Sequence, residues 1–223
     1  MRHFTEDERI ARVWDKEEAK KVLFRNMYYM AADQRQQALD ELWVKEPAHA
    51  ATASYGKNWG YYIGMDEIRR YYVDNDPFGG VGTMNCHPVA TIRLEQAEDG
   101  QTILCQWYNA SYETRMVNGV LTPLWICEKG NADLVKEGDQ WKIWHYFIGT
   151  DLQAEAGTNY ADQPVDLPVE DDPVAQEFGT PTLKMDAYIT RYNYYPYPAI
   201  PEPYETYRPE LGCGPEGNPK YKA

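Results

Sequence analysis

The stretch 140–150 reads QWKIWHYFIGT and decides the fold class. Successive side chains of a β-strand point to opposite faces, so this segment would place apolar rings on both of its faces. One face would carry Trp141, Ile143, His145 and Phe147, and the other Trp144, Tyr146 and Ile148. Helices must cover one of these faces, and the C-terminal segment or another subunit must cover the other. The stretch therefore predicts a long strand in a sheet that packs on helices.

Three further strands lead up to this one. Residues 89–96 alternate in polarity, residues 98–100 form a turn, and residues 102–115 are long enough for a strongly bent strand. A strand over 121–135 and the turn 136–139 complete the meander. The sheet is therefore expected to be antiparallel.

Helical patterns come before the sheet. Thr5-x-x-Glu8 is a capping box that opens an amphipathic segment with Ile10, Val13 and Trp14 on its apolar face. Asp15-x-x-Glu18 predicts a second helix, whose core stripe would be Val22, Leu23, Met27 and Met30. Shorter elements should follow: a helix over 34–43, a hairpin formed by 50–55 and 59–63 around Gly56, and a helix over 65–74. Helices grouped ahead of an antiparallel sheet predict an α+β domain.

Charge and composition exclude several classes of partner. The chain has 35 acidic and 22 basic residues, a net charge of −13, and no basic stripe. Nucleic acid and anionic membranes are therefore not expected partners. The charged start MRHFTEDE argues against a signal peptide, and no apolar run could span a membrane. Four cysteines without metal-ligand spacing predict free thiols, no metal site and a cytoplasmic protein.

The composition changes near residue 150. Residues 1–150 hold four of the 15 prolines, whereas 151–223 hold the other 11 together with nine of the 19 tyrosines and a charge of −8. Proline removes backbone donors and favours extended geometry. We therefore expect an α+β domain over 1–150 and an extended acidic Tyr/Pro-rich arm over 151–223. Residues 151–172 should be solvated, and 185–207 should lie against the chain's own domain or a neighbouring subunit.

The order of elements resembles the SnoaL-like branch of the nuclear transport factor 2-like superfamily. The resemblance covers about residues 8–152. It rests on the first helices with Ala31-Ala32-Asp33, the short helix that ends Leu39-x-x-Leu42-Trp43, the helix opened by 64–68, and the meander that ends at 140–144. It implies a cone-shaped domain whose curved sheet and N-terminal helices enclose a cavity. The superfamily includes polyketide cyclases, scytalone dehydratase, bile-acid dehydratases, steroid isomerases, non-catalytic binding proteins and small subunits of ring-hydroxylating dioxygenases.

The resemblance also implies a set of site residues. Tyr28 and Asp33 have the five-residue spacing of the dehydratase members, and His87 precedes a long strand. His145 occupies the last-strand position at which bile-acid dehydratases have Arg. In the expected mechanism His87 removes a proton beside a carbonyl, Asp33 orients the imidazole, and Tyr28 and His145 polarise the carbonyl. Strand position alone makes Trp107, Asn109 and Trp125 candidates for the cavity wall.

Each of these residues also has a structural interpretation. Asp33-x-x-Gln36 is itself a capping box, His87 precedes Pro88 in a turn, and His145 lies among aromatic residues of a strand. Two classes of function therefore stay open. The first is a cofactor-independent lyase or isomerase for a hydroxylated aromatic, polyketide or steroid-like small molecule. The second is a non-catalytic binding protein or structural subunit. A homo-oligomer, dimer or trimer, with the arm at its interface is expected in either case.

Overall fold

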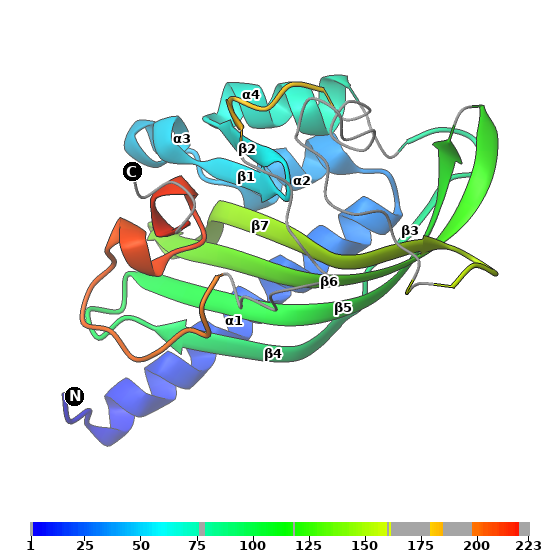
Figure 1. The fold of residues 1–223 in the computed structure, drawn as a ribbon. Coiled ribbons are helices and arrows are strands. Elements are labelled where there is room, and N and C mark those ends of the chain that lie inside the picture. The colour runs from blue at the N-terminus through cyan, green and yellow to red at the C-terminus, as the bar shows by residue number, and fades with distance from the viewer. Residues whose placement is uncertain are drawn as a thin grey trace.

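The computed structural model describes residues 2–75, 79–117, 119–159, 161, 179–184 and 198–218. A long curved sheet forms the body of the molecule, and helix α1 crosses behind it in the view of Figure 1. We call the face toward α1 the inner face and the opposite one the outer face. The helices are α1 (Glu6–Ala31), α2 (Arg35–Leu42), α3 (Pro47–Thr52), α4 (Met65–Arg69), the π-helical turn η1 (Arg70–Asp74), and the 3₁₀ turns η3 (Pro209–Leu211) and η4 (Pro215–Gly217).

Helix α1 is one helix of 26 residues, not the two that the sequence suggested. The capping box at its start is confirmed, because the Thr5 side chain accepts from the Glu8 backbone N–H and Glu8 reaches back to Thr5. Asp15 starts no new helix. Its carboxylate accepts hydrogen bonds from Gln96, Lys136 and Trp141 and so ties α1 to the sheet.

The first turns of α1 also differ from expectation. Ile10, Val13 and Trp14 are each 63% exposed, so the predicted apolar face of this segment does not enter the core. The sheet is buried instead by the second half of the helix, where Ala19 and Leu23 have no exposed surface. The stripe predicted over Val22, Leu23, Met27 and Met30 does pack on the core.

The eight-stranded sheet runs in the order β3-β5-β6-β7-β1-β2-β8, and β4 pairs with β5. Its pairs are antiparallel except β1–β7, which is parallel, so the sheet is mixed and not purely antiparallel. The strands are β1 (Ser54–Lys57), β2 (Gly60–Ile63), β3 (Met84–Cys86), β4 (Val89–Gln96), β5 (Thr102–Val117), β6 (Val120–Glu137), β7 (Gln140–Glu155) and β8 (Leu183–Lys184). The α+β cone fold is thereby confirmed.

Smaller departures concern the connections. Residues 50–52 belong to α3, so the hairpin turns at Asn58 and Trp59 and not at Gly56. The helix expected over 65–74 is α-helical only to Arg69 and continues as η1. Strand β7 runs on to Glu155, past the position where we placed the end of the domain. Among the described residues no helix is long and apolar enough to cross a membrane.

The inner face carries the main core. Its largest fully buried side chains include Trp43 and Trp107. The indole of Trp107 lies against Gly130 so closely that a Cβ there would come within 2.1 Å of the ring. This glycine is therefore required by packing, because Gly alone leaves room for the indole on the neighbouring strand.

The C-terminal residues 198–218 lie on the outer face, in front of the sheet in Figure 1. Glu98 and Asp99 donate backbone N–H groups to Tyr204 and Glu205, and the Tyr204 hydroxyl bonds to Thr102. This part of the arm thus packs on its own domain, one of the two alternatives we expected. Of the segments we assigned to the arm, 185–197 and 162–178 lie outside the described residues.

Candidate active site

A pocket opens between helix α1 and the inner face of the sheet. The empty space among its lining atoms, open solvent included, is about 410 Å³. Apolar and aromatic groups from α1, η1 and the sheet form part of the wall, and polar side chains from β1, β5, β6 and the β3–β4 region form the rest. The lining residues are Met27, Met30, Tyr55, Lys57, Tyr72, Asn85, His87, Asn109, Glu113, Glu128, Tyr146 and Ile148.

His87 lies between two glutamates of this pocket. It occupies the short link between β3 and β4, where Pro88 interrupts pairing with β5. Its Nε2 is 2.8 Å from Glu113 Oε1, and its Nδ1 is 2.9 Å from Glu128 Oε2. Both ring nitrogens can act as donors only when the imidazole is protonated. The geometry therefore describes an imidazolium held by two carboxylates.

The electrostatics of the pocket agree with a protonated His87. Burial disfavours the charged ring, but Glu128 and Glu113 outweigh it and raise the pKa of His87 to about 10. Burial likewise opposes the charge of Glu128, yet Lys57 and His87 lower the pKa of its carboxyl far below the ordinary value. At neutral pH His87 is therefore a proton donor and not the free base that we expected.

Other polar groups hold the two glutamates in place. Glu128 has Lys57 Nζ at 3.6 Å from Oε1 and accepts the Thr150 hydroxyl at 3.2 Å on the same oxygen. Glu113 Oε2 lies 3.1 Å from Arg115 Nε. His87, Lys57 and Arg115 thus face two carboxylates. Such buried charges are tolerated because each has an opposite charge beside it.

Phenol rings of Tyr55, Tyr72 and Tyr146 form another part of the pocket wall. The rings of Tyr55 and Tyr146 stack with centroids 5.8 Å apart, and Tyr72 lies 5.2 Å from Tyr55. Burial raises the pKa of all three hydroxyls, so they stay protonated. Because flat aromatic surfaces favour other rings, this wall suits a planar ligand.

The two site residues predicted at the end of α1 do not reach the pocket. Met27 and Met30 line the pocket, whereas Tyr28, about 100° further around the helix than Met27, is 77% exposed. Asp33 has φ 57°, is 57% exposed at its side chain, and lies 3.2 Å from the buried guanidinium of Arg35. It neither orients His87 nor caps α2, whose N-cap Gln34 makes no side-chain capping bond. The expected Asp33–His87 pair is therefore wrong.

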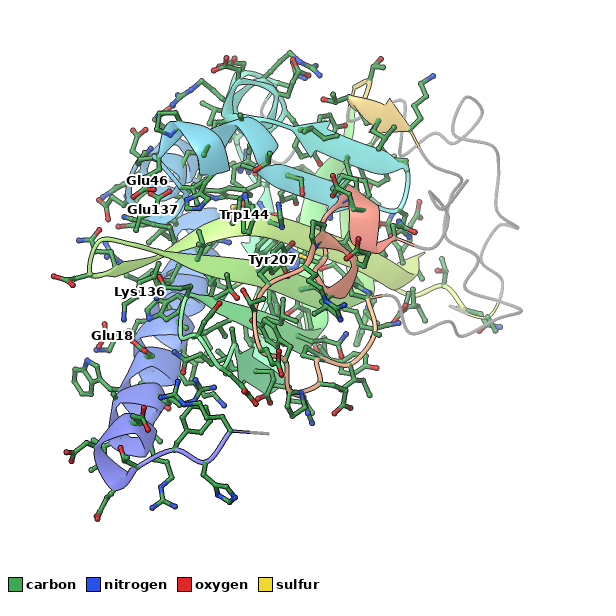
Figure 2. The ribbon with its side chains drawn as sticks, turned by 90° about the vertical axis from the view of Figure 1, so that its left-hand side faces the viewer. Glu18, Glu46, Lys136, Glu137, Trp144 and Tyr207 are labelled. Atoms are coloured by element: carbon green, nitrogen blue, oxygen red, sulfur yellow. The ribbon has the colours of Figure 1, made fainter. Side chains whose placement is uncertain are left out.

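His145 lies on the outer face, not in the pocket. Its Nδ1 is 2.8 Å from Asp133 Oδ2, and the Tyr207 hydroxyl approaches both groups at 3.1 Å. Figure 2 shows Tyr207 beside Trp144, whose ring centroid is 4.8 Å from that of Tyr207. The backbone N–H of Cys213 also donates to Asp133. This buried cluster fastens the C-terminal segment to the sheet and is separate from the pocket.

The three residues predicted from strand position to line the cavity lie in different parts of the structure. Asn109 lines the pocket. Trp107 is fully buried in the inner core and is not among the lining residues. Trp125 is 53% exposed, its ring contacts Tyr112 of β5, and it is not among the residues that line the pocket. Of these three, only Asn109 is therefore placed to meet a ligand.

Sequence reasoning missed Glu113, Glu128 and Lys57. A weak signal existed, since charged residues inside predicted strands are unusual unless paired. Glu113 shares the inward parity of Asn109, and Asn109 pairs with Glu128 in the β5–β6 register. That pairing could not be read without knowing the register of the two long strands.

A second group of possible ligands lies at the far end of the sheet. Glu46, His49 and Glu137 bring one ligand atom each to within 4.8 Å of one another, and Figure 2 shows the two glutamates together. Glu137, however, already accepts backbone N–H groups of Lys45 and Glu46 and contacts His49 Nδ1 at 2.9 Å. These bonds explain the group as a fastening of the start of α3.

Comparisons with known proteins agree with the fold. No family model and no curated protein matches the sequence. Solved structures do match, among them a hexachlorocyclohexane dehydrochlorinase of type 2 with a TM-score of 0.54 and 12% identity, over 70% of this chain and 99% of that one. A candidate scytalone dehydratase from Novosphingobium aromaticivorans has a TM-score of 0.53 and 10% identity, over 67% and 92%.

A third matching structure differs from the first two in the activity that its name gives. It is a candidate aromatic ring hydroxylase from Novosphingobium aromaticivorans, with a TM-score of 0.52 and 11% identity, over 65% of this chain and 94% of that one. Identities this low speak for the fold alone. The chain thus shares the cone-shaped α+β fold of these solved structures.

Proposed function

We propose that this chain is a cofactor-independent lyase that eliminates water or another small leaving group from a ring-bearing small molecule. The observation that carries the proposal is the pair formed by protonated His87 and the carboxylate of Glu113, 2.8 Å apart in a pocket with aromatic walls. An elimination needs one group that accepts a proton from carbon and one that donates a proton to the leaving group. This pair offers both.

The proton balance closes within the pair. Glu113 takes a proton from the substrate carbon while His87 Nε2 gives its proton to the leaving hydroxyl. The C–H and C–O bonds break, a C=C bond forms, and water leaves. Glu113 then returns the substrate proton to Nε2 across their 2.8 Å contact. Glu128 holds Nδ1 throughout and fixes the ring.

Negative charge that develops on the substrate has donors nearby. Lys57 and the protonated phenols of Tyr55 and Tyr146 line the same pocket. Donors that are fixed before the reaction stabilise a developing oxyanion without reorganising. This role replaces the one that we expected for Tyr28 and His145. The names of two structural neighbours, a dehydrochlorinase and a candidate dehydratase, also refer to eliminations and give independent support.

The test is elimination from a panel of cyclic hydroxy-ketones, followed by the ultraviolet absorbance of the new conjugated double bond. His87→Gln and Glu113→Gln should each lower kcat by about 10²- to 10⁴-fold, the usual contribution of a general acid or base. His49→Gln is the matched control, because it removes a histidine–glutamate pair outside the pocket. Full activity in both pocket variants would reject the mechanism.

One observation favours the non-catalytic alternative. Both nitrogens of His87 are already engaged by glutamates, as in an ion-pair network that only stabilises the sheet. That alternative predicts that the chain binds ring compounds and turns none of them over. It also predicts a loss of stability in His87→Gln without any catalytic consequence. A purely structural subunit would be expected to have an apolar, filled interior, whereas this pocket is lined by charged side chains.

A further inference from the structure

Asn109 presents a buried hydrogen-bond acceptor that has no partner among the described residues. The side chain is on β5, is 1% exposed and lines the pocket. Its Nδ2 donates to Glu128 Oε2 at 3.5 Å, whereas its Oδ1 has no hydrogen bond. A buried acceptor left unsatisfied costs about 1–3 kcal/mol, so this position calls for an explanation.

The orientation of this amide is fixed by its neighbour. Asn109 stands opposite Glu128 in the β5–β6 register. A carboxylate can only accept at neutral pH, and the lowered pKa of Glu128 keeps it in that form. Turning the amide over would place two acceptors against each other. The donor side of the amide therefore faces Glu128, and Oδ1 is left for whatever enters the pocket.

The surroundings define what Oδ1 can bind. An acceptor requires an O–H or N–H donor on the ligand. The stacked rings of Tyr55 and Tyr146 suit a flat ring. Glu113 and Glu128 are acceptors that repel a ligand anion beside Asn109. The ligand group that fits is a neutral hydroxyl carried on a planar ring.

We propose that Asn109 is a specificity-determining residue that accepts a hydrogen bond from a hydroxyl of a planar, ring-bearing ligand. This inference deepens the proposed function. It rests on that function in one respect, which is that the pocket is the ligand site. Because a site built to bond a hydroxyl rejects analogues that lack it, the residue would exclude ethers and unsubstituted rings. It leaves the proton transfers to His87 and Glu113.

The experiment measures binding and needs no turnover. The probes are 2-naphthol, its methyl ether 2-methoxynaphthalene, and naphthalene, titrated at pH 7 by calorimetry against the full chain. The wild type should bind 2-naphthol about tenfold or more tightly than either analogue. In Asn109→Leu the preference should fall to about twofold or less. Asn131→Leu is the matched control, since Asn131 is equally buried but lies on the outer face, bonded to Gln106, and it should keep the preference.

Several results would overturn the proposal. They are equal affinity of the wild type for the three probes, an unchanged preference in Asn109→Leu, or no binding of 2-naphthol up to its solubility. If Asn109→Leu does not fold, the wild-type comparison of the three probes and Asn109→Ser, which shortens the side chain, still decide the matter. If the preference for 2-naphthol depends on Asn109 but no elimination is detected, this inference stands and the proposed lyase activity is rejected. If elimination is detected but the preference is absent, the lyase activity stands and this inference is rejected.

Discussion

The protonation of His87 leads to a stability prediction that can be tested without a substrate. The two glutamates raise the pKa of the imidazole from the ordinary 6.5 to about 10 in the folded chain. A group whose pKa is raised by folding stabilises the fold fully below its unfolded pKa and loses that contribution as the pH rises through its folded pKa. The stabilisation by His87 is therefore complete below pH 6.5 and disappears toward pH 10.

The size of the effect follows from the shift. One pKa unit is worth about 1.4 kcal/mol, so His87 contributes on the order of several kcal/mol at low pH. Between the two pKa values the folded chain holds one more proton than the unfolded chain. The free energy of unfolding should therefore fall by about 1.4 kcal/mol per pH unit because of this residue.

The assay is urea unfolding of the wild type and His87→Gln at several pH values between 7.5 and 9.5. The difference in free energy of unfolding between the two proteins should shrink steadily as the pH rises. In parallel, imidazole NMR spectra of both proteins are recorded. The signal that is present in the wild type and missing in His87→Gln belongs to His87. That signal should keep its protonated position through pH 8.

A flat difference between the two proteins over this range would refute the reasoning, as would an imidazole signal that titrates near pH 6.5. Either result would mean that His87 is neutral between its glutamates at neutral pH. The acid role in the proposed elimination would then fall with it.

Three more predictions concern packing within the chain and contacts between copies of it. Gly130→Ala should destabilise the fold by about 1–3 kcal/mol in urea unfolding, because the new Cβ meets the Trp107 indole; unchanged stability would contradict this. Tyr207→Phe should cost about 1.5–3 kcal/mol, since its hydroxyl bonds to the Asp133 carboxylate, and a neutral result would show that the cluster does not hold the C-terminal segment. A homo-oligomer stays a prediction: the half-exposed Trp125 belongs at its interface, so Trp125→Asp should convert oligomer to monomer in native mass spectrometry, and a wild-type monomer would refute it.

Local signals predicted the elements better than their relations. The Thr5–Glu8 capping box marks the helix start because all of its contacts lie within one turn. The similar pattern at Asp15 failed because its carboxylate is used by the sheet, a contact no local pattern reveals. Strand position correctly set Asn109 toward the helices, but it misplaced Trp125. The alternation expected along 141–147 also breaks between Ile143 and His145.

Relations across the chain were harder to predict. Tyr28 was chosen for its spacing to Asp33, but the rotation of α1 is set by Met27 and Met30 packing on the core. His145 was placed on the strand that ends the meander, yet its face depends on a bulge between Asp133 and Leu134 in the register with β6. One residue of slip exchanges the faces of a strand. The face on which such a residue lies therefore depends on helix rotation and strand register, which the sequence pattern does not specify.

Asp33 contacts Arg35 of the helix that follows, whereas two glutamates contact the histidine of the pocket. The guanidinium of Arg35 is buried, and a buried cation requires a carboxylate nearby. Asp33, two residues away, is within 3.2 Å of it. The carboxylates that contact the imidazole come from the inner face of β5 and β6, as Glu113 and Glu128. Because a carboxylate on a paired strand moves less than one at a helix end, this arrangement holds the imidazole from both sides. The two carboxylates together keep His87 protonated at neutral pH.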